Sequence, residues 1–111
     1  MIAHRINPDG AELWFKNNEF YKTNGPGMIL GNGQEQWLRH DEHYRINGPA
    51  ELHPNGNEFW YENGRIHRDK GPAMLHSDGE EIWCKKGAWR RKKGPAFINS
   101  FGGQIWNEND E

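Results

Sequence analysis

Histidine is the residue type in this chain best suited to metal binding or to general acid–base catalysis, and the sequence contains six copies of it. None of them has a cysteine at the short spacing that a zinc site requires. His53 and His76 lie at equivalent positions of two successive segments, so stacking of these segments would bring them close together. We expect the histidines to be surface or turn partners, and we predict no metal and no other cofactor. The full set is His4, His40, His43, His53, His67 and His76.

Nucleophilic catalysis needs a nucleophile, a base and a group that orients the base. The only serines, Ser77 and Ser100, adjoin expected turns, and the single cysteine, Cys84, lies in an apolar segment where a buried thiol is expected. Glu80 and Glu81 are adjacent, and neighbours in a strand point to opposite faces, which makes them poor acid–base partners. The sequence therefore predicts a protein that is not an enzyme.

Positive charge is concentrated in residues 85–93, which contain six of the 14 lysines and arginines and none of the 16 acidic residues. One interpretation is a solvated loop in a degenerate segment. The other is a docking patch for an anionic partner: an acidic protein, a phospholipid head group or nucleic acid. Nucleic acid is the less favoured partner because the formal net charge of the chain is only −2. The candidate binding residues here are Lys85, Lys86, Trp89, Arg90, Arg91, Lys92 and Lys93.

A second set of candidate binding residues comprises Arg45, Arg68 and His67. The two arginines belong to an evenly spaced series of cations, with Lys22 and Arg91 as the other members. Structurally, each cation could bond to backbone carbonyls or to a neighbouring acid and so join successive segments. Functionally, a ladder of cations could bind a polyanion or an acidic protein surface.

The elements that position these residues follow a strict period of 23. Tryptophan stands at positions 14, 37, 60, 83 and 106, a glycine precedes each tryptophan by four residues, and Gly-Pro stands at 25, 48, 71 and 94. We interpret the chain as a single domain, 1–111, of about four and a half copies, at about 2–24, 25–47, 48–70, 71–93 and a partial copy at 94–111. Each copy would bury its apolar face only against its neighbours.

The composition limits what such a stack can be. Only 33% of the residues are hydrophobic, so aliphatic side chains are too few for a conventional two-layer core, whereas six Trp, three Tyr and five Phe argue against disorder. No apolar run approaches the length needed to span a membrane. We expect a soluble, cytoplasmic protein.

Turn signals recur twice in each copy. Asp78-Gly79 predicts a hairpin with a two-residue loop, and Lys86-Gly87 predicts a second one, with segments of strand length between the turns. Nothing in the chain has helical periodicity. The prediction is an all-β fold: an elongated, single-sheet solenoid of antiparallel β-hairpins, on the order of 45 Å long. It would have a broad surface without a pocket, and open sheet edges through which two copies could pair as a homodimer.

The predicted registers assign side chains to faces. With two-residue loops, Leu75, Ile82, Cys84 and Trp89 share one face, which we expect to be the core. The equivalent positions in other copies are Leu52, Phe59, Tyr61 and Ile66, and Ile6, Leu13, Phe15 and Phe20. The opposite face would have the tryptophan series, paired with aromatic or cationic partners at Tyr21, Tyr44, His67 and Arg90.

A two-strand unit with this period, a recurrent tryptophan and spaced glycines resembles the MORN repeat (membrane occupation and recognition nexus). The segment from Trp60 to Ala73 is more similar to a variant with Trp-x-x-x-Gly followed by His-Arg-x-x-Gly-Pro-Ala, which occurs in short proteins of bacteriophages and giant viruses. The turn glycine lies four residues after the tryptophan, where the family usually has three, and Gly-Pro-Ala replaces a glycine doublet. The resemblance covers nearly the whole chain and implies a scaffold or docking surface.

Two functions are therefore expected from the sequence. The first is a non-enzymatic protein–protein interaction module, a small phage or viral accessory protein that binds and inhibits a host defence protein in the cytoplasm of the host cell. The alternative is a binder of nucleic acid or another anionic ligand through residues 85–93.

Overall fold

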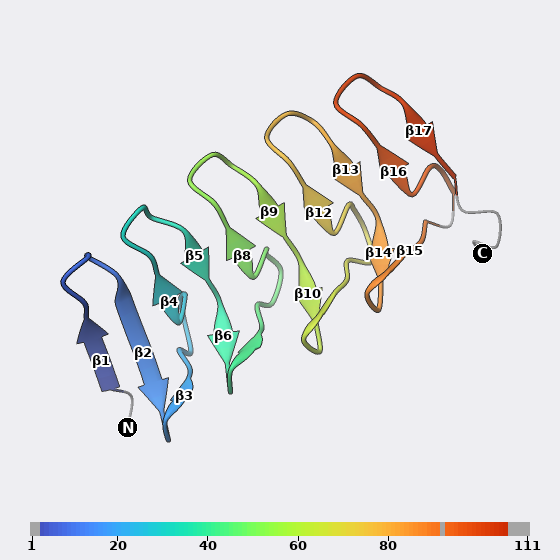
Figure 1. The fold of residues 1–111 in the computed structure, drawn as a ribbon. Coiled ribbons are helices and arrows are strands. Elements are labelled where there is room, and N and C mark those ends of the chain that lie inside the picture. The colour runs from blue at the N-terminus through green and yellow to red at the C-terminus, as the bar shows by residue number, and fades with distance from the viewer. Residues whose placement is uncertain (1–2, 92, 107–111) are drawn as a thin grey trace.

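The structure is a computed structural model that describes residues 3–91 and 93–106. The regular elements in these ranges are all β-strands, and successive hairpins lie side by side along one long axis (Figure 1). The molecule measures 47 × 25 × 17 Å, close to the predicted length. The predicted all-β, elongated architecture is therefore confirmed. In the described ranges, no helix is long and apolar enough to cross a membrane.

One antiparallel sheet of 11 strands runs the length of the molecule. Its strand order is β1-β2-β4-β5-β8-β9-β12-β13-β16-β17, and β3 also pairs with β2. The strands are β1 (Ala3–Ile6), β2 (Glu12–Lys16), β3 (Glu19–Phe20), β4 (Met28–Ile29), β5 (Glu35–Gln36), β8 (Glu51–Leu52), β9 (Glu58–Phe59), β12 (Met74–Leu75), β13 (Glu81–Ile82), β16 (Phe97–Ile98) and β17 (Gln104–Ile105).

Three smaller hairpins extend from the long sheet, each a two-stranded sheet of its own. They are β6 (Leu38–Arg39) with β7 (Glu42–His43), β10 (Tyr61–Glu62) with β11 (Arg65–Ile66), and β14 (Cys84–Lys85) with β15 (Ala88–Trp89). The β2–β3 pair is the equivalent hairpin of the first copy. Each of the four full copies thus contributes one wide hairpin to the long sheet and one tight hairpin beside it (Figure 1).

The tight hairpins have the predicted two-residue loops. Cys84 pairs with Trp89, and the loop residues Lys86 and Gly87 both have positive φ, of 53° and 83°. Two successive positive φ values define the type I′ turn, whose twist matches that of the flanking strands. The same geometry recurs at residues 17–18, 40–41 and 63–64, except that Asp41 and Asn18 replace the glycine.

The wide hairpins differ from the prediction by one residue. The His76 N–H donates to the Glu80 carbonyl over 2.9 Å, so Ser77, Asp78 and Gly79 form a three-residue loop in which Gly79 alone has positive φ, of 96°. The Asp78 side chain accepts a hydrogen bond from the Glu80 N–H over 2.9 Å, which stabilises this loop. An Asp-Gly pair suits both loop types, and the three-residue loop is the one that forms.

This shift changes the predicted faces. Met74, and not Leu75, pairs with Ile82 and shares its face. Leu75, Leu52 and Ile6 were predicted in the core but lie on the opposite face, where Leu75 and Leu52 pair with Glu81 and Glu58. Ile6 is 66% exposed. A one-residue change of register moves every side chain of a strand to the other face, which is why these three assignments were wrong.

The core consists of small residues as well as large ones. Ala50, Ala73 and Ala96 of the Gly-Pro-Ala segments are at most 1% exposed, and Ala73 packs with Ile82 and Cys84. Ala73 bridges neighbouring strands, because its N–H donates to the Ile82 carbonyl and its carbonyl accepts from the Trp60 N–H. Cys84 is 3% exposed, which confirms the predicted buried thiol, and this burial raises the pKa of the thiol. Trp89, predicted in the core, is 44% exposed and stacks on Phe97.

Candidate functional site

Four tryptophans of the series stack against a cation of their own copy. The charged group lies 3.7 to 3.8 Å from the ring centroid in each pair: Lys22 on Trp14, Arg45 on Trp37, Arg68 on Trp60 and Arg91 on Trp83. The partners predicted from the sequence each precede the observed cation by one residue. They bind the tryptophans through the backbone instead: the His67 N–H, for example, donates to the Trp60 carbonyl. The predicted side-chain pairing with Tyr21, Tyr44, His67 and Arg90 was therefore offset by one residue.

Each arginine of the series also binds the following Gly-Pro-Ala segment. Nη1 of Arg68 donates to the Pro72 carbonyl over 3.3 Å, and Arg45 and Arg91 make the same bond. A methyl group on Gly71 would lie 2.7 Å from Arg68 Cζ, so only glycine leaves room for the guanidinium. Three of the candidate binding residues, Arg45, Arg68 and Arg91, thus bond to backbone carbonyls, as one of the two sequence interpretations proposed.

The tryptophan, the arginine and the glycine beside it form a repeated contact unit, and a glutamate also belongs to it. The Trp60 indole N–H donates to Glu58 over 3.2 Å, and Trp37 and Trp83 donate in the same way to the glutamates two residues before them. A carboxylate therefore accompanies each arginine along this face. That arrangement reduces the net positive field expected of a simple cation ladder.

The basic side chains of residues 85–93 lie in different surroundings. Lys85 lies on β14, and Lys86 occupies the tight turn with an exposed side chain. Arg91 is directed to the Trp83 ring, whereas Arg90 and Lys93 are exposed. The remaining candidate of this segment, Lys92, lies outside the described residues.

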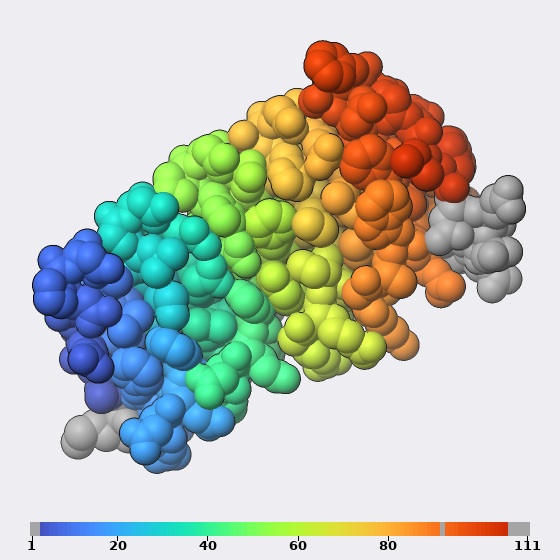
Figure 2. All heavy atoms as spheres, in the orientation of Figure 1, coloured from blue at the N-terminus to red at the C-terminus, as the bar shows by residue number. Residues whose placement is uncertain are grey.

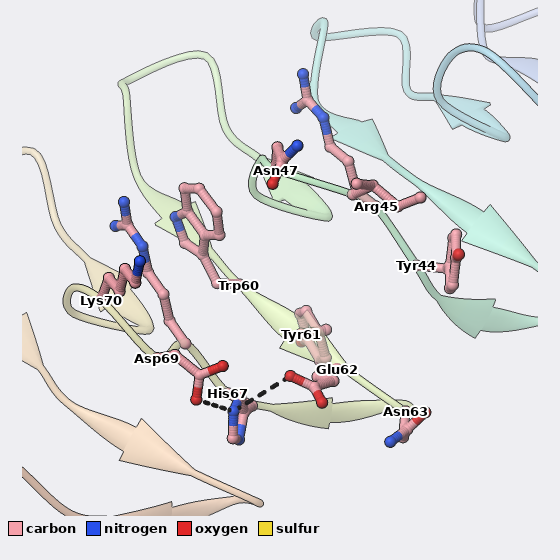
Figure 3. Close-up of a pocket in the computed structure, with 12 residues that line it drawn as sticks. Tyr44, Arg45, Asn47, Trp60, Tyr61, Glu62, Asn63, His67, Asp69 and Lys70 are labelled. Carbon is pink, nitrogen blue, oxygen red and sulfur yellow. Dashed lines mark hydrogen bonds and ion pairs between the residues drawn. The ribbon is translucent and has the colours of Figure 1, made fainter.

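His67 forms a hydrogen-bonded cluster with two carboxylates (Figure 3). Its Nε2 lies 2.9 Å from Asp69 and 3.2 Å from Glu62, and its Nδ1 accepts the Lys86 N–H over 2.9 Å. Since Nδ1 accepts, Nε2 holds the proton and donates it to the carboxylates. A histidine that ligates a metal usually donates its other N–H, the opposite of this arrangement. The three ligand groups are near enough to surround an ion, but the bond from Lys86 favours a structural role that joins adjacent hairpins.

Every histidine of the chain lies within ion-pair distance of a carboxylate. His53 is 2.6 Å from Glu51 and His76 is 3.6 Å from Glu80, and both rings pack edge-on against Phe59. These two histidines are thus near each other, as their equivalent positions indicated. The other pairs are His4 with Glu12, His40 with Glu19, His43 with Glu51, and His67 with Glu62 and Asp69.

Glu51 is the centre of a polar cluster that sequence reasoning missed. Burial, the charge of Glu51 and a hydrogen bond to it raise the pKa of Tyr61 to about 12. His43 stacks on Tyr61 at 4.1 Å and bonds to Gln36 over 2.6 Å. Burial lowers the pKa of His43, and the charge of Glu51 opposes that effect. These residues come from β5, β7, β8 and β10, and no local pattern connects them.

The surface is hollowed between adjacent tight hairpins, contrary to the prediction of a surface without a pocket. The larger cleft, which we call the His67 cleft, measures about 630 Å³ and contains Trp60, His67 and Arg68. The smaller one, the Arg39 cleft, measures about 340 Å³ and contains Trp37 and Arg39. Both are open to solvent, and Tyr44, Arg45 and Ile46 line both of them.

The two clefts are the same site in successive copies. Their linings correspond after a shift of one period: Trp37 to Trp60, Arg39 to Glu62, Tyr44 to His67, Arg45 to Arg68 and Ile46 to Asp69. In the space-filling view the copies form successive bands along the long axis (Figure 2). No protein-family model matches the chain, and a search of the curated proteins finds no match either.

Proposed function

We propose that this chain is a non-enzymatic protein-binding module built from MORN-like repeats. The observation that supports the proposal most is the exposure of large apolar side chains along an extended sheet. Ile46 is 71% exposed between the two clefts, and Phe101, Ile105 and Trp106 are 97%, 52% and 61% exposed in the last copy. Contiguous exposed apolar groups are typical of protein-binding surfaces, and these four residues are our candidates for such a surface.

The contacts between the histidines and carboxylates also support a non-enzymatic role. A general base needs a ring nitrogen that can reach a substrate proton. Both nitrogens of His67 are already engaged, and the other five histidines have a carboxylate as a neighbour. The arrangement suits structural polar contacts between strands better than catalysis.

We further propose that the partner is a host protein and that the chain is a small phage or viral accessory protein which inhibits it in the host cytoplasm. This part rests on the similarity of the segment 67–73, which reads His-Arg-x-x-Gly-Pro-Ala, to short viral repeat proteins. The test is affinity capture of the tagged chain from bacterial lysate, followed by mass spectrometry and reconstitution of the complex from purified components. A stoichiometric partner whose activity falls in the complex is expected.

Two substitutions and one control locate the surface. Ile46→Asp and Phe101→Asp place the same charge on each exposed apolar region, and Arg65→Asp places it on an exposed position of β11. We expect at least one of the first two to abolish capture and the third to retain it. Absence of any stoichiometric partner, or capture unchanged by both apolar substitutions, would contradict the proposal.

A second candidate function is binding of an anionic ligand, nucleic acid included, through residues 85–93. The proximity of Lys85 and Lys86 at one tight hairpin supports it. Gel-shift assays with DNA and RNA over a salt series would show affinity that falls steeply with salt and that Lys85→Glu and Lys86→Glu remove. Pairing of two copies through the outermost strands β1 and β17 would appear as a dimer in sedimentation.

A further inference from the structure

Among the described residues, the Arg39 cleft is lined by three cations and by no acidic residue. Lys22, Arg39 and Arg45 line it together with Thr23 and Asn24, and Lys22 and Arg45 also stack on tryptophan rings. A fourth cation, Lys16, lies nearby, with Nζ 4.9 Å from the centre of the Tyr21 ring. The carboxylate of the repeated unit, Glu35, accepts the Trp37 indole N–H over 3.1 Å and keeps its charge, but it does not line the cleft. Three lining cations against this one carboxylate leave the cleft with a positive potential.

Arg39 is held in this cleft without a polar partner for its buried nitrogen. Its Cζ lies 4.4 Å from the Tyr44 ring centroid and 5.4 Å from that of Tyr21. Within the part of the chain that the structure describes, Arg39 Nε is the single buried side-chain nitrogen or oxygen that lacks a hydrogen bond. Burial of a polar nitrogen without a hydrogen bond is unfavourable, and an anion bound at the exposed end of the guanidinium would offset part of that cost.

The next copy shows the same cleft with two carboxylates among three cations, so most of the positive charge is offset. In the His67 cleft, Glu62 occupies the position of Arg39, and Asp69 occupies that of Ile46. Both carboxylates bind His67 and lie among the cations of that cleft (Figure 3). The repeat therefore supplies the shape of the cleft, and the residues at positions 39 and 46 determine how much positive charge remains there.

We propose that the Arg39 cleft binds a phosphate monoester of a small molecule. A phosphate monoester has a charge of about −1.5 to −2 and three acceptor oxygens, which suits two guanidiniums and an ammonium better than a singly charged carboxylate does. The volume of about 340 Å³ lies within the range of small-molecule sites. Trp37 and Tyr44 supply aromatic surface for an attached organic group. Ile46 of the proposed apolar surface also lines this cleft, but titration with small-molecule probes tests the cleft without any protein partner.

Calorimetric titration at about 0.15 M salt tests the proposal, with inorganic phosphate, AMP and adenosine as probes. We expect phosphate and AMP to bind with one site per chain and adenosine not to bind. Equal affinity for the first two would assign the phosphate group alone as the ligand, whereas tighter binding of AMP would add the organic group. Either result supports the site. Absence of saturable binding by both, or equal binding of adenosine and AMP, overturns it.

Substitutions then locate the bound anion. Arg39→Gln removes the charge and is expected to weaken binding by at least about tenfold, since a hydrogen bond to a charged group contributes that much. Arg65→Gln removes an exposed charge elsewhere and should leave affinity unchanged. Thr23 is exposed, so Thr23→Val tests the same site with little risk to folding, and a weaker loss is expected. Full affinity in both Arg39→Gln and Thr23→Val would overturn the assignment.

Discussion

At the scale of single residues, the guanidinium beside each Gly-Pro-Ala segment accounts for its glycine, because a larger side chain would collide with it. Tryptophan, arginine, glycine and glutamate recur together because they form one contact unit: the cation stacks on the ring, bonds to the Pro carbonyl and lies against the glycine. Cation–π contacts of this kind contribute about 0.5–2 kcal/mol each. Repetition along the sheet makes the unit a substantial part of the stability of so small a core.

Gly71→Ala tests this unit. The new methyl group would lie 2.7 Å from Arg68 Cζ, while the backbone of Gly71 does not require positive φ, so the effect comes from space alone. We expect a loss of about 1–3 kcal/mol in the free energy of unfolding, measured by urea denaturation. In an Arg68→Ala background the same substitution should cost much less, because the clash is gone. Equal losses in the two backgrounds would show that the guanidinium does not impose the glycine.

The second residue-scale prediction concerns pH and His43. Its pKa is lowered in the folded state, so below pH 6.5 the unfolded chain takes up a proton that the folded chain resists. The stability that His43 contributes is complete above pH 6.5 and is lost as pH falls through the folded pKa. His43→Phe keeps the stacking on Tyr61 and removes the titrating group. Melting temperatures between pH 7.5 and 5 should therefore fall less in His43→Phe than in the wild type, and parallel curves would contradict this.

At the scale of elements, the tight hairpins could be predicted from the sequence and the wide ones could not. Lys86-Gly87 and its equivalents occupy positions where both residues need positive φ, and their register was correct. Asp78-Gly79 was ambiguous, because glycine at positive φ and an aspartate side chain that bonds to the backbone suit two loop lengths. The resulting error placed Leu75 in the core and left Met74 out of it.

The candidate site was predicted less well than the fold. Arg45 and Arg68 were recognised because they recur, but the identity of their ring partners depends on side-chain direction, which the period alone does not give. The sequence analysis did not identify the Arg39 cleft. Position 39 is cationic in three of the four full copies, with Glu62 as the exception. The period alone does not show that Lys22, Arg39 and Arg45 of two copies line one cleft.

The wide loops supply the prediction that belongs to this scale. Asp78→Ala removes the acceptor for the Glu80 N–H and should lower the free energy of unfolding by about 1 kcal/mol. Asp78→Asn keeps that acceptor, as Asn32 and Asn55 do in the equivalent loops, and should have little effect. Chemical denaturation of the two variants distinguishes them. Equal stability of the alanine and asparagine variants would mean that the side-chain bond does not stabilise the loop.

At the scale of the whole molecule, stability should be a sum over copies and the contacts between them. The copies join through backbone bonds such as the one from the Trp60 N–H to the Ala73 carbonyl, and the same bond recurs from Trp37 to Ala50 and from Trp83 to Ala96. A stack of this kind tolerates loss of a whole unit. It does not tolerate loss of part of a copy, because a register shift by an odd number of residues moves apolar side chains to the solvent face.

Deletion of residues 48–70 removes one whole period and joins Asn47 to Gly71, which occupies the position of Gly48. We expect this chain to fold, to melt at a lower temperature than the full chain and to be shorter by roughly 10 Å, the width of two strands. Deletion of 48–69 removes one residue fewer, shifts the register and should not fold cooperatively. Thermal unfolding followed by circular dichroism, together with small-angle X-ray scattering for the length, measures both outcomes. If the two deletions had the same melting temperature, the copies could not be equivalent units of one continuous sheet.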